Sequence, residues 1–426
     1  MKKISKSKEV KSITQLITGT SIAQLIPLLI SPILSRLYNE NEFGHYSTFY
    51  SCVVILTVLN TGRLELALFI PKEPKTLKSI FKTQVYFTIA SSIVVFAIVS
   101  TIIFFVPKNE NLVFLDFQFW TVVSLTALFT GIGNGIAYYT NRISEFKSLA
   151  QAKVARSSSK ASSSLLFGFV KLSSVGLNFS ELISSIVYFS FLSVKSKIFL
   201  GLKLIPTKHS LLEAKSILIR YKNFIKYSVP SGVMENVSAY MPALLVPLYF
   251  GFNYLGLFAF AQRIINFPST LISQAFGEVF KQKFSDKYSK GEACLPLFYR
   301  TIKRLLLIAA PGYFILYIIA PEFFIRVFGD NWEFSGVLTR YMIPMIILQF
   351  IVSPLSSVLL ITERQKIDLY FQLVLTPLIF ISLLVGKYAN DFGLAIQLYS
   401  TVYAIKYIVE IIITYRIIYK YERTRI

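Results

Sequence analysis

Seven ionisable side chains lie within long apolar stretches of this sequence, and they are the residues that could do chemistry. A charge inside a membrane is costly, so such groups normally face a bundle interior, a water-filled cavity or one another. Four are basic and three are acidic. A slightly cationic cavity suits an anionic ligand, because arginine matches phosphate oxygens. The seven residues are Arg63, Glu65, Glu235, Arg263, Arg340, Lys406 and Glu410.

Glu235 and Arg263 are predicted to lie near mid-depth in two consecutive spans. Prolines free backbone carbonyls and let a helix bend at depth, and they interrupt both spans, at Pro242, Pro247 and Pro268. Asn266 adds a polar side chain to the second span. Two interpretations stay open: both charges line a moving cavity, or they form a structural ion pair. In the first, Glu235 is the candidate for binding a coupling proton.

The other five charged groups have simpler structural interpretations beside the functional one. Lys406 and Glu410 are four residues apart, which predicts an ion pair on one helix face. Arg63 and Glu65 are two apart, so a regular helix cannot present both on one face. Arg63 and Arg340 each lie toward one end of a span, where a long side chain can extend to the interface.

The composition indicates a membrane protein that crosses the bilayer many times. Of 426 residues, 54% are hydrophobic and only 15% are charged, against about 25% charged in an ordinary soluble domain. The net charge of +22 comes from basic residues in short loops between apolar runs, a placement that sets membrane orientation and argues against nucleic acid. With two cysteines, two histidines and no nucleotide motif, the sequence predicts no metal site, no cofactor and no enzyme.

The apolar pattern predicts twelve spans, since one crossing needs about 20 apolar residues. The fifth is the weakest, because its first half is rich in serine and basic residues and could lie at the interface. The predicted spans are 13–35, 46–70, 80–106, 117–140, 154–172, 175–194, 224–250, 254–276, 303–327, 335–361, 367–386 and 392–416.

The loop charges predict the orientation and two halves. With the N-terminus in the cytoplasm, the outer loops hold only four basic residues, Arg36, Lys108, Lys171 and Lys387. Both termini are therefore expected in the cytoplasm. Residues 1–194 and 224–426 form two predicted six-helix bundles, joined by a basic linker, 195–223. That linker is either a solvated loop or carries an amphipathic helix at Leu211–Arg220 that lies on anionic lipid.

A short pattern recurs at the start of each half. An apolar helix with two prolines five residues apart is followed by a turn that ends in an apolar residue and glycine. The two copies contain Pro27, Pro32 and Phe43-Gly44, and Pro242, Pro247 and Leu255-Gly256. The recurrence suggests a duplicated membrane protein, a common plan for transporters.

Several motifs, taken in order, cover nearly the whole chain: Pro32-Ile-Leu-Ser-Arg36-Leu-Tyr38, Arg63-Leu-Glu65-Leu-Ala67, Gly256-Leu-Phe-Ala-Phe-Ala-Gln-Arg263 and Phe328-Gly329-Asp-Asn-Trp332. In this order and spacing they resemble the Wzx-type polysaccharide and O-antigen flippases of the multidrug/oligosaccharidyl-lipid/polysaccharide (MOP) exporter superfamily. The resemblance implies an all-α, MATE-like membrane fold of two six-helix bundles around a central cavity. It also implies that Arg63, Glu65 and Arg263 line that cavity.

The resemblance further implies the activity. Such a flippase moves undecaprenyl-pyrophosphate-linked oligosaccharide repeat units, for O-antigen or capsule, from the inner to the outer leaflet of the bacterial inner membrane. It works by alternating access, driven by an ion gradient, and a polysaccharide polymerase and a chain-length regulator are its expected partners. A MATE-like cation-coupled drug exporter is the alternative. A membrane-embedded polymerase is disfavoured, because the predicted outer loops are short.

Overall fold

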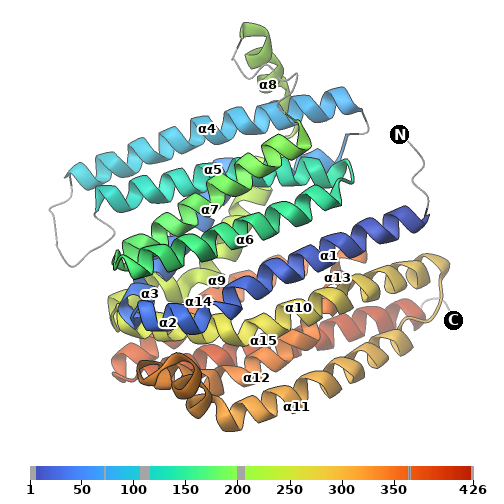
Figure 1. Cartoon of the computed structure of the whole chain (residues 1–426). Coiled ribbons are helices and arrows are strands. Elements are labelled where there is room, and N and C mark those ends of the chain that lie inside the picture. Colours follow the sequence, from blue (N-terminus) through green and yellow to red (C-terminus); the bar gives the residue numbers. More distant parts are fainter. Residues whose placement is uncertain are drawn as a thin grey trace. The chain divides into compact units, whose positions relative to one another are not determined.

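The computed structural model describes residues 6–71, 73–105, 116–198, 207–362, 364 and 366–423. These residues are almost entirely helical and contain no strand. The all-α membrane fold that the sequence predicts is therefore confirmed. Figure 1 shows long helices running side by side within each part of the chain.

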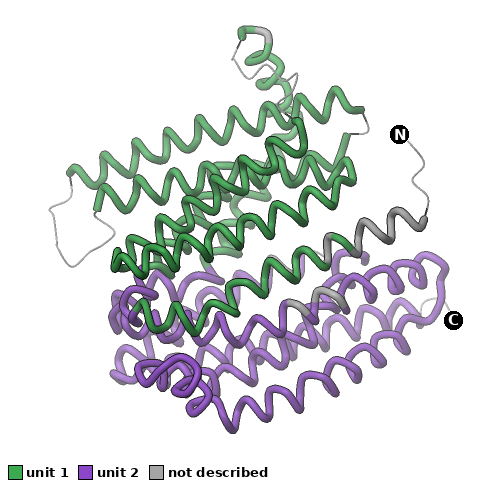
Figure 2. Tube along the Cα trace, in the orientation of Figure 1, with its two compact units in different colours: residues 1–38, 46–237 green, residues 39–45, 238–426 purple. Residues whose placement is uncertain are grey.

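Contacts divide the chain into two compact units, shown in Figure 2. Unit 1 comprises residues 1–38 and 46–237, and unit 2 comprises residues 39–45 and 238–426. Two of the three boundaries fall inside helices, so the start of one helix and the end of another belong to unit 2. The predicted halves, 1–194 and 224–426, divide the chain at other residues and stay a prediction.

Unit 1 is built from the helices before residue 238. They are α1 (Lys6–Leu29), α2 (Ser31–Leu37), most of α3 (Glu40–Thr61), the 3₁₀ helix η1 (Leu64–Phe69), α4 (Pro74–Phe105), α5 (Phe117–Arg142), α6 (Phe146–Phe169), α7 (Ser173–Ser196), α8 (Lys208–Arg220), the π-helix η3 (Phe224–Ser228) and the first part of α9 (Val229–Tyr249). Its core packs α4, α5 and α7 against η1 and α8.

Unit 2 contains the start of α3, the end of α9 and the helices that follow. These are α10 (Phe252–Lys290), α11 (Leu295–Phe328), η4 (Asp330–Trp332), α12 (Glu333–Leu355), α13 (Ser357–Ile361), α14 (Lys366–Tyr388) and α15 (Phe392–Arg423). An aromatic cluster joins its segments: the Phe260 ring centroid lies 4.1 Å from that of Trp332, and Phe43 lies 5.3 Å from both.

Each of the twelve predicted spans coincides with a long helix or a pair of consecutive helices. Within the described residues, eight of these segments are long and apolar enough to cross a membrane. The other four predicted spans correspond to α3, α6, α9 and α10, which have the length of a span but are more polar. Polar residues on a spanning helix are tolerated where they face the bundle interior.

The fifth predicted span, 154–172, is one continuous helix, α6, that begins earlier, at Phe146. Its polar first half packs against α1 and α7 inside unit 1, because several of its serines and basic residues have partners there. The serine-rich composition therefore reflects an inward-facing polar surface. The linker helix predicted at Leu211–Arg220 is also present, as α8.

The two glycines of the repeated pattern meet at one helix crossing in unit 2. A Cβ on Gly44 would overlap the carbonyl oxygen of Phe252, and one on Gly256 would overlap that of Glu40. The starts of α3 and α10 thus approach backbone to backbone, which only glycine permits. The recurring Gly is explained by this close approach, whereas the duplication itself stays a prediction.

Candidate functional site

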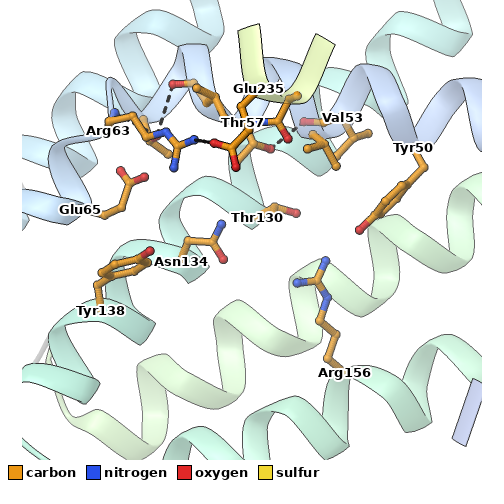
Figure 3. A pocket seen from close by; sticks show the side chains of 14 residues that line it. Tyr50, Val53, Thr57, Arg63, Glu65, Thr130, Asn134, Tyr138, Arg156 and Glu235 are labelled. Atoms are coloured by element: carbon orange, nitrogen blue, oxygen red, sulfur yellow. Dashed lines mark hydrogen bonds and ion pairs between the residues drawn. The ribbon is translucent and has the colours of Figure 1, made fainter. Parts of the chain in front are cut away.

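Unit 1 contains an open polar cavity of about 370 Å³. Its walls come from α3, η1, α5, α6 and the first part of α9 (Figure 3). Three of the predicted site residues, Arg63, Glu65 and Glu235, line it together. Arg156 lines it from α6.

Arg63 and Glu65 reach the same cavity because helix α3 ends just before them. Gly62 and Arg63 both adopt left-handed backbone angles, with φ of 60° and 55°, and η1 begins at Leu64. The prediction that these two residues cannot share a face assumed a regular helix and is wrong. A left-handed conformation costs a non-glycine residue about 1–2 kcal/mol, so the surrounding packing holds Arg63 in a strained turn.

Arg63 pairs with Glu235 across the cavity. Its Nη2 lies 3.8 Å from Oε2 of Glu235, whose side chain is 65% exposed. Gly232, one turn earlier on α9, makes room for the guanidinium, because a Cβ there would overlap Nη2. A salt bridge this long and this exposed stabilises the fold by less than about 1 kcal/mol. The Nε of Arg63 is buried and has no hydrogen-bond partner among the described residues, so the guanidinium keeps unused donor capacity.

Glu65 is the buried acid of the cavity. It is only 6% exposed, and its Oε2 has no hydrogen-bond partner within the described part of the chain. Asn134 and Tyr138 of α5 line the cavity beside it (Figure 3). An unpaired buried carboxylate oxygen is costly, and it can accept a proton or a cation that enters the cavity.

A second charged cluster holds Arg156 at the opposite wall. Its Nη2 donates to Oε1 of Glu181 over 3.1 Å, and the Lys160 ammonium lies 2.5 Å from Oε2. The Tyr46 hydroxyl also donates to Oε2, over 2.8 Å. Glu181 is 2% exposed, whereas Arg156 is 27% exposed and points into the cavity. The acid is therefore the buried anchor, and the arginine is the group presented to a ligand.

Cations outnumber acids in this cluster. Lys153, Arg156 and Lys160 are spaced three and four residues apart, so they lie on one face of α6. Lys153 donates to the Thr20 hydroxyl over 3.1 Å rather than to an acid. Aromatic rings partly offset the excess positive charge. The guanidinium carbon of Arg156 lies 5.3 Å from the ring centroid of Tyr188, and Nζ of Lys160 lies 5.0 Å from that of Tyr46. The α6 wall thus presents a cation, Arg156, whereas the rest of the charged lining holds two acids, Glu65 and Glu235, and one base, Arg63.

The Lys406–Glu410 prediction is confirmed. Lys406 Nζ lies 2.6 Å from Glu410 Oε2 on α15 in unit 2. The ammonium also lies over the Tyr407 ring, 4.4 Å from its centroid. The glutamate is buried and its charge is matched, so the pair has a sufficient structural explanation.

Arg340 has a structural partner in unit 2 that the sequence did not suggest. Its Nε donates to the Tyr317 carbonyl over 2.8 Å, and its Nη2 to the Ile318 carbonyl over 2.7 Å. Pro321 has no N–H, so the Tyr317 carbonyl lacks its normal helical donor. Arg340 supplies that donor and closes the gap in α11, which is a different role from extending to the interface.

Arg263 and Asn266 lie on α10 in unit 2 and are both half-buried. The Oδ1 of Asn266 is buried without a partner in the described residues. Glu235 belongs to unit 1, where its ion pair is with Arg63. The ion pair with Arg263 that the sequence left open stays a prediction.

Sequence reasoning missed the Arg156 cluster. Two signals were available: three basic residues at helical spacing on one face of α6, and Glu181 in the middle of an apolar run. The first signal is easily overlooked, because the basic residues of α6 are counted as cytoplasmic loop charges in the sequence analysis. Three or more potential metal ligands do not gather anywhere in the described residues.

The comparisons with known proteins agree with this architecture. A family model described as polysaccharide biosynthesis protein matches residues 33–336. No curated protein matches the sequence. Among solved structures, the lipid II flippase MurJ in an inward closed conformation has a TM-score of 0.72 at 11% identity, covering 96% of this chain and 87% of that one.

Two further structures show the same fold. An inward-facing multidrug resistance MATE family transporter of the MOP superfamily has a TM-score of 0.65 at 12% identity, covering 96% of this chain and 95% of that one. A MOP superfamily transporter from Pyrococcus furiosus has a TM-score of 0.61 at 13% identity and covers 97% of both chains. The chain therefore has the fold of MATE transporters and MurJ, and it belongs to the polysaccharide biosynthesis protein family.

Proposed function

We propose that this protein flips undecaprenyl-pyrophosphate-linked oligosaccharide repeat units from the inner to the outer leaflet of a bacterial plasma membrane. The observation that carries the proposal is Arg156, which presents a guanidinium to the unit 1 cavity while the buried Glu181 holds it in place. A pyrophosphate is the most charged part of such a substrate, and a guanidinium binds phosphate oxygens in a fork.

Further features of the cavity support an anionic, hydroxyl-rich substrate. Arg63 adds a second guanidinium with a buried, unused Nε. Threonine, asparagine and tyrosine side chains make up most of the remaining polar wall and can exchange hydrogen bonds with sugar hydroxyls; they are Thr57, Thr61, Thr130, Asn134, Tyr50, Tyr138 and Asn236. The repeat unit belongs to a surface polysaccharide such as O-antigen or capsule.

Translocation proceeds by alternating access and uses an ion gradient. Glu65 and Glu235 are the acidic groups of the cavity that could bind the coupling ion, and Glu65 has the buried, unpaired oxygen. Both termini lie in the cytoplasm, and a polymerase and a chain-length regulator act next on the flipped unit. The protein itself catalyses no covalent reaction.

Gene deletion with complementation tests the proposal. Deleting the gene in its host, in a background without a second flippase, should abolish surface polysaccharide and leave lipid-linked repeat units on the cytoplasmic side. The wild-type gene should restore export, and Arg156→Ala should not, although the variant protein reaches the membrane. Normal surface polysaccharide in the deletion strain would overturn the proposal.

The two acids of the cavity favour one competing function, export of organic cations. Glu65 and Glu235 could hold a cationic drug, as a MATE-like exporter would require. The same deletion strain separates the two functions, because a drug exporter would change sensitivity to cationic compounds while surface polysaccharide stayed normal.

A further inference from the structure

We propose that helix α8 (Lys208–Arg220) is a docking surface for anionic phospholipid headgroups. This inference does not depend on what the cavity transports. It rests on the way α8 is fixed to unit 1, on the residues of its outer face, and on its place beside a membrane-spanning helix.

Helix α8 is a well-formed element with a reason to begin where it does. The Thr207 hydroxyl accepts from the Ser210 amide over 3.2 Å, and the Ser210 hydroxyl accepts from the Thr207 amide over 2.8 Å. These reciprocal bonds satisfy two amides that a helix start leaves without partners. The segment is therefore ordered as a helix and not as a solvated loop.

One face of α8 is fixed to the first half of α4. The Ser79 hydroxyl donates to Oε1 of Glu213 over 2.5 Å, and the hydroxyls of Tyr86 and Ser210 lie 3.5 Å apart. Ala214 and Ile217 are buried, and Ile217 belongs to the core of unit 1. This face accounts for only part of the apolar surface of the helix.

The opposite face of α8 is also apolar. Leu212 and Ile219 are seven residues apart and so lie on one face, about opposite Ala214 and Ile217. They are 67% and 59% exposed, and Leu211 is exposed as well. Exposure of these apolar side chains to water is unfavourable. Their burial at the boundary between lipid headgroups and acyl chains is favourable.

Basic residues flank this exposed apolar face. Lys208 and Lys215 lie on one side of it and Arg220 on the other, and Lys222 follows the helix. All four are exposed. The only acidic residue of α8, Glu213, is turned toward α4, where it accepts from Ser79. All the charged side chains on the outer face of α8 are therefore basic. This positive charge complements anionic headgroups.

The position of α8 fits a bilayer surface. In Figure 1 it lies on the outer flank of unit 1, beyond α4. α4 is one of the helices apolar enough to cross the membrane, and its bonds to α8 come from Ser79 and Tyr86, in its first half. A helix beside the first half of a span, apolar and basic on its outer face, matches the pattern of an interfacial helix.

Fluorescence of the full-length protein in lipid nanodiscs tests this inference. An environment-sensitive dye is attached at Leu212→Cys, since the native Cys52 and Cys294 are buried. Emission is compared between discs of phosphatidylcholine alone and discs that also contain phosphatidylglycerol. We expect a blue shift and protection from aqueous iodide only in the anionic discs, and both should decrease at high salt. Equal emission and equal quenching in the two lipids would overturn the proposal.

A charge-reversal pair makes the test specific. Lys215→Glu with Arg220→Glu, in the dye-labelled protein, should return the emission in anionic discs to its value in phosphatidylcholine, because each basic residue near such a surface changes partitioning about fivefold. Lys281→Glu with Lys283→Glu changes the net charge equally, at exposed positions near the end of α10, and should leave the blue shift intact. A blue shift that survives the α8 pair, or that the α10 pair abolishes, would contradict recognition by α8.

Discussion

Arg156 and Glu181 form the contact on which the candidate site depends, with Nη2 of the arginine 3.1 Å from Oε1 of the glutamate. The two residues differ sharply in exposure, since the acid is buried and the base faces the cavity. Glu181 also neutralises Lys160. One carboxylate thus holds two cations, and the surplus positive charge is presented to the cavity.

Replacing Glu181 by Gln should destabilise unit 1 strongly. The change leaves Arg156 and Lys160, which are 27% and 30% exposed, without an acid, and removing one partner of a buried pair costs up to about 3–5 kcal/mol. Thermal unfolding of the purified protein in detergent should show a clear drop in midpoint. Glu235→Gln is the control, because its exposed pair with Arg63 should contribute less than about 1 kcal/mol. Equal effects of the two variants would contradict this assignment.

Gly44→Ala and Gly256→Ala should each weaken the crossing of α3 and α10. Their Cβ atoms would overlap backbone carbonyl oxygens that cannot move cheaply, and overpacking of this kind costs about 1–3 kcal/mol. Gly312→Ala is the matched control, since nothing lies within 4 Å of its Cβ position on α11. That control should leave stability unchanged or raise it by up to about 1 kcal/mol. Thermal midpoints of the three variants test the ranking.

Arg340 and Pro321 should show coupled effects on stability. Arg340→Ala removes the donor to the Tyr317 carbonyl. This carbonyl lies within a helix apolar enough to span the membrane, and an acceptor left unsatisfied away from water costs about 1–3 kcal/mol. Pro321→Ala restores the amide that would bond this carbonyl, so Arg340→Ala should cost less in that background. A double-mutant cycle of thermal stability measures the difference. Strictly additive effects would show that Arg340 does not replace the missing amide.

The sequence predicted the helices better than the geometry of the site. Apolar runs of span length appear directly as helices, and the spacing of Lys406 and Glu410 was sufficient to predict their ion pair. Arg63 and Glu65 were misjudged because their shared orientation depends on a backbone break at Gly62. Which residues end a helix in the left-handed conformation is set by tertiary packing as much as by local composition.

Helix α6 shows why polar residues in a membrane protein are hard to interpret. Its serines and basic residues indicate an interface or a loop when counted along the chain. The same residues indicate an internal polar wall once their spacing is compared with a helical turn. Glu181, on another helix, supplies the missing counter-charge, and no local pattern on α6 points to it.

Translocation in proteoliposomes is the most direct test of whether the Arg156 cavity moves the lipid-linked substrate. The purified protein is reconstituted with an undecaprenyl-pyrophosphate-linked oligosaccharide, and the sugar reaching the opposite leaflet is measured with a membrane-impermeant lectin. We expect translocation by the wild type, a loss of at least about tenfold with Arg156→Ala, and partial recovery with Arg156→Lys, which keeps charge but not the fork. Translocation that is equal in all three proteins, or absent in the wild type under an imposed ion gradient, would contradict the account.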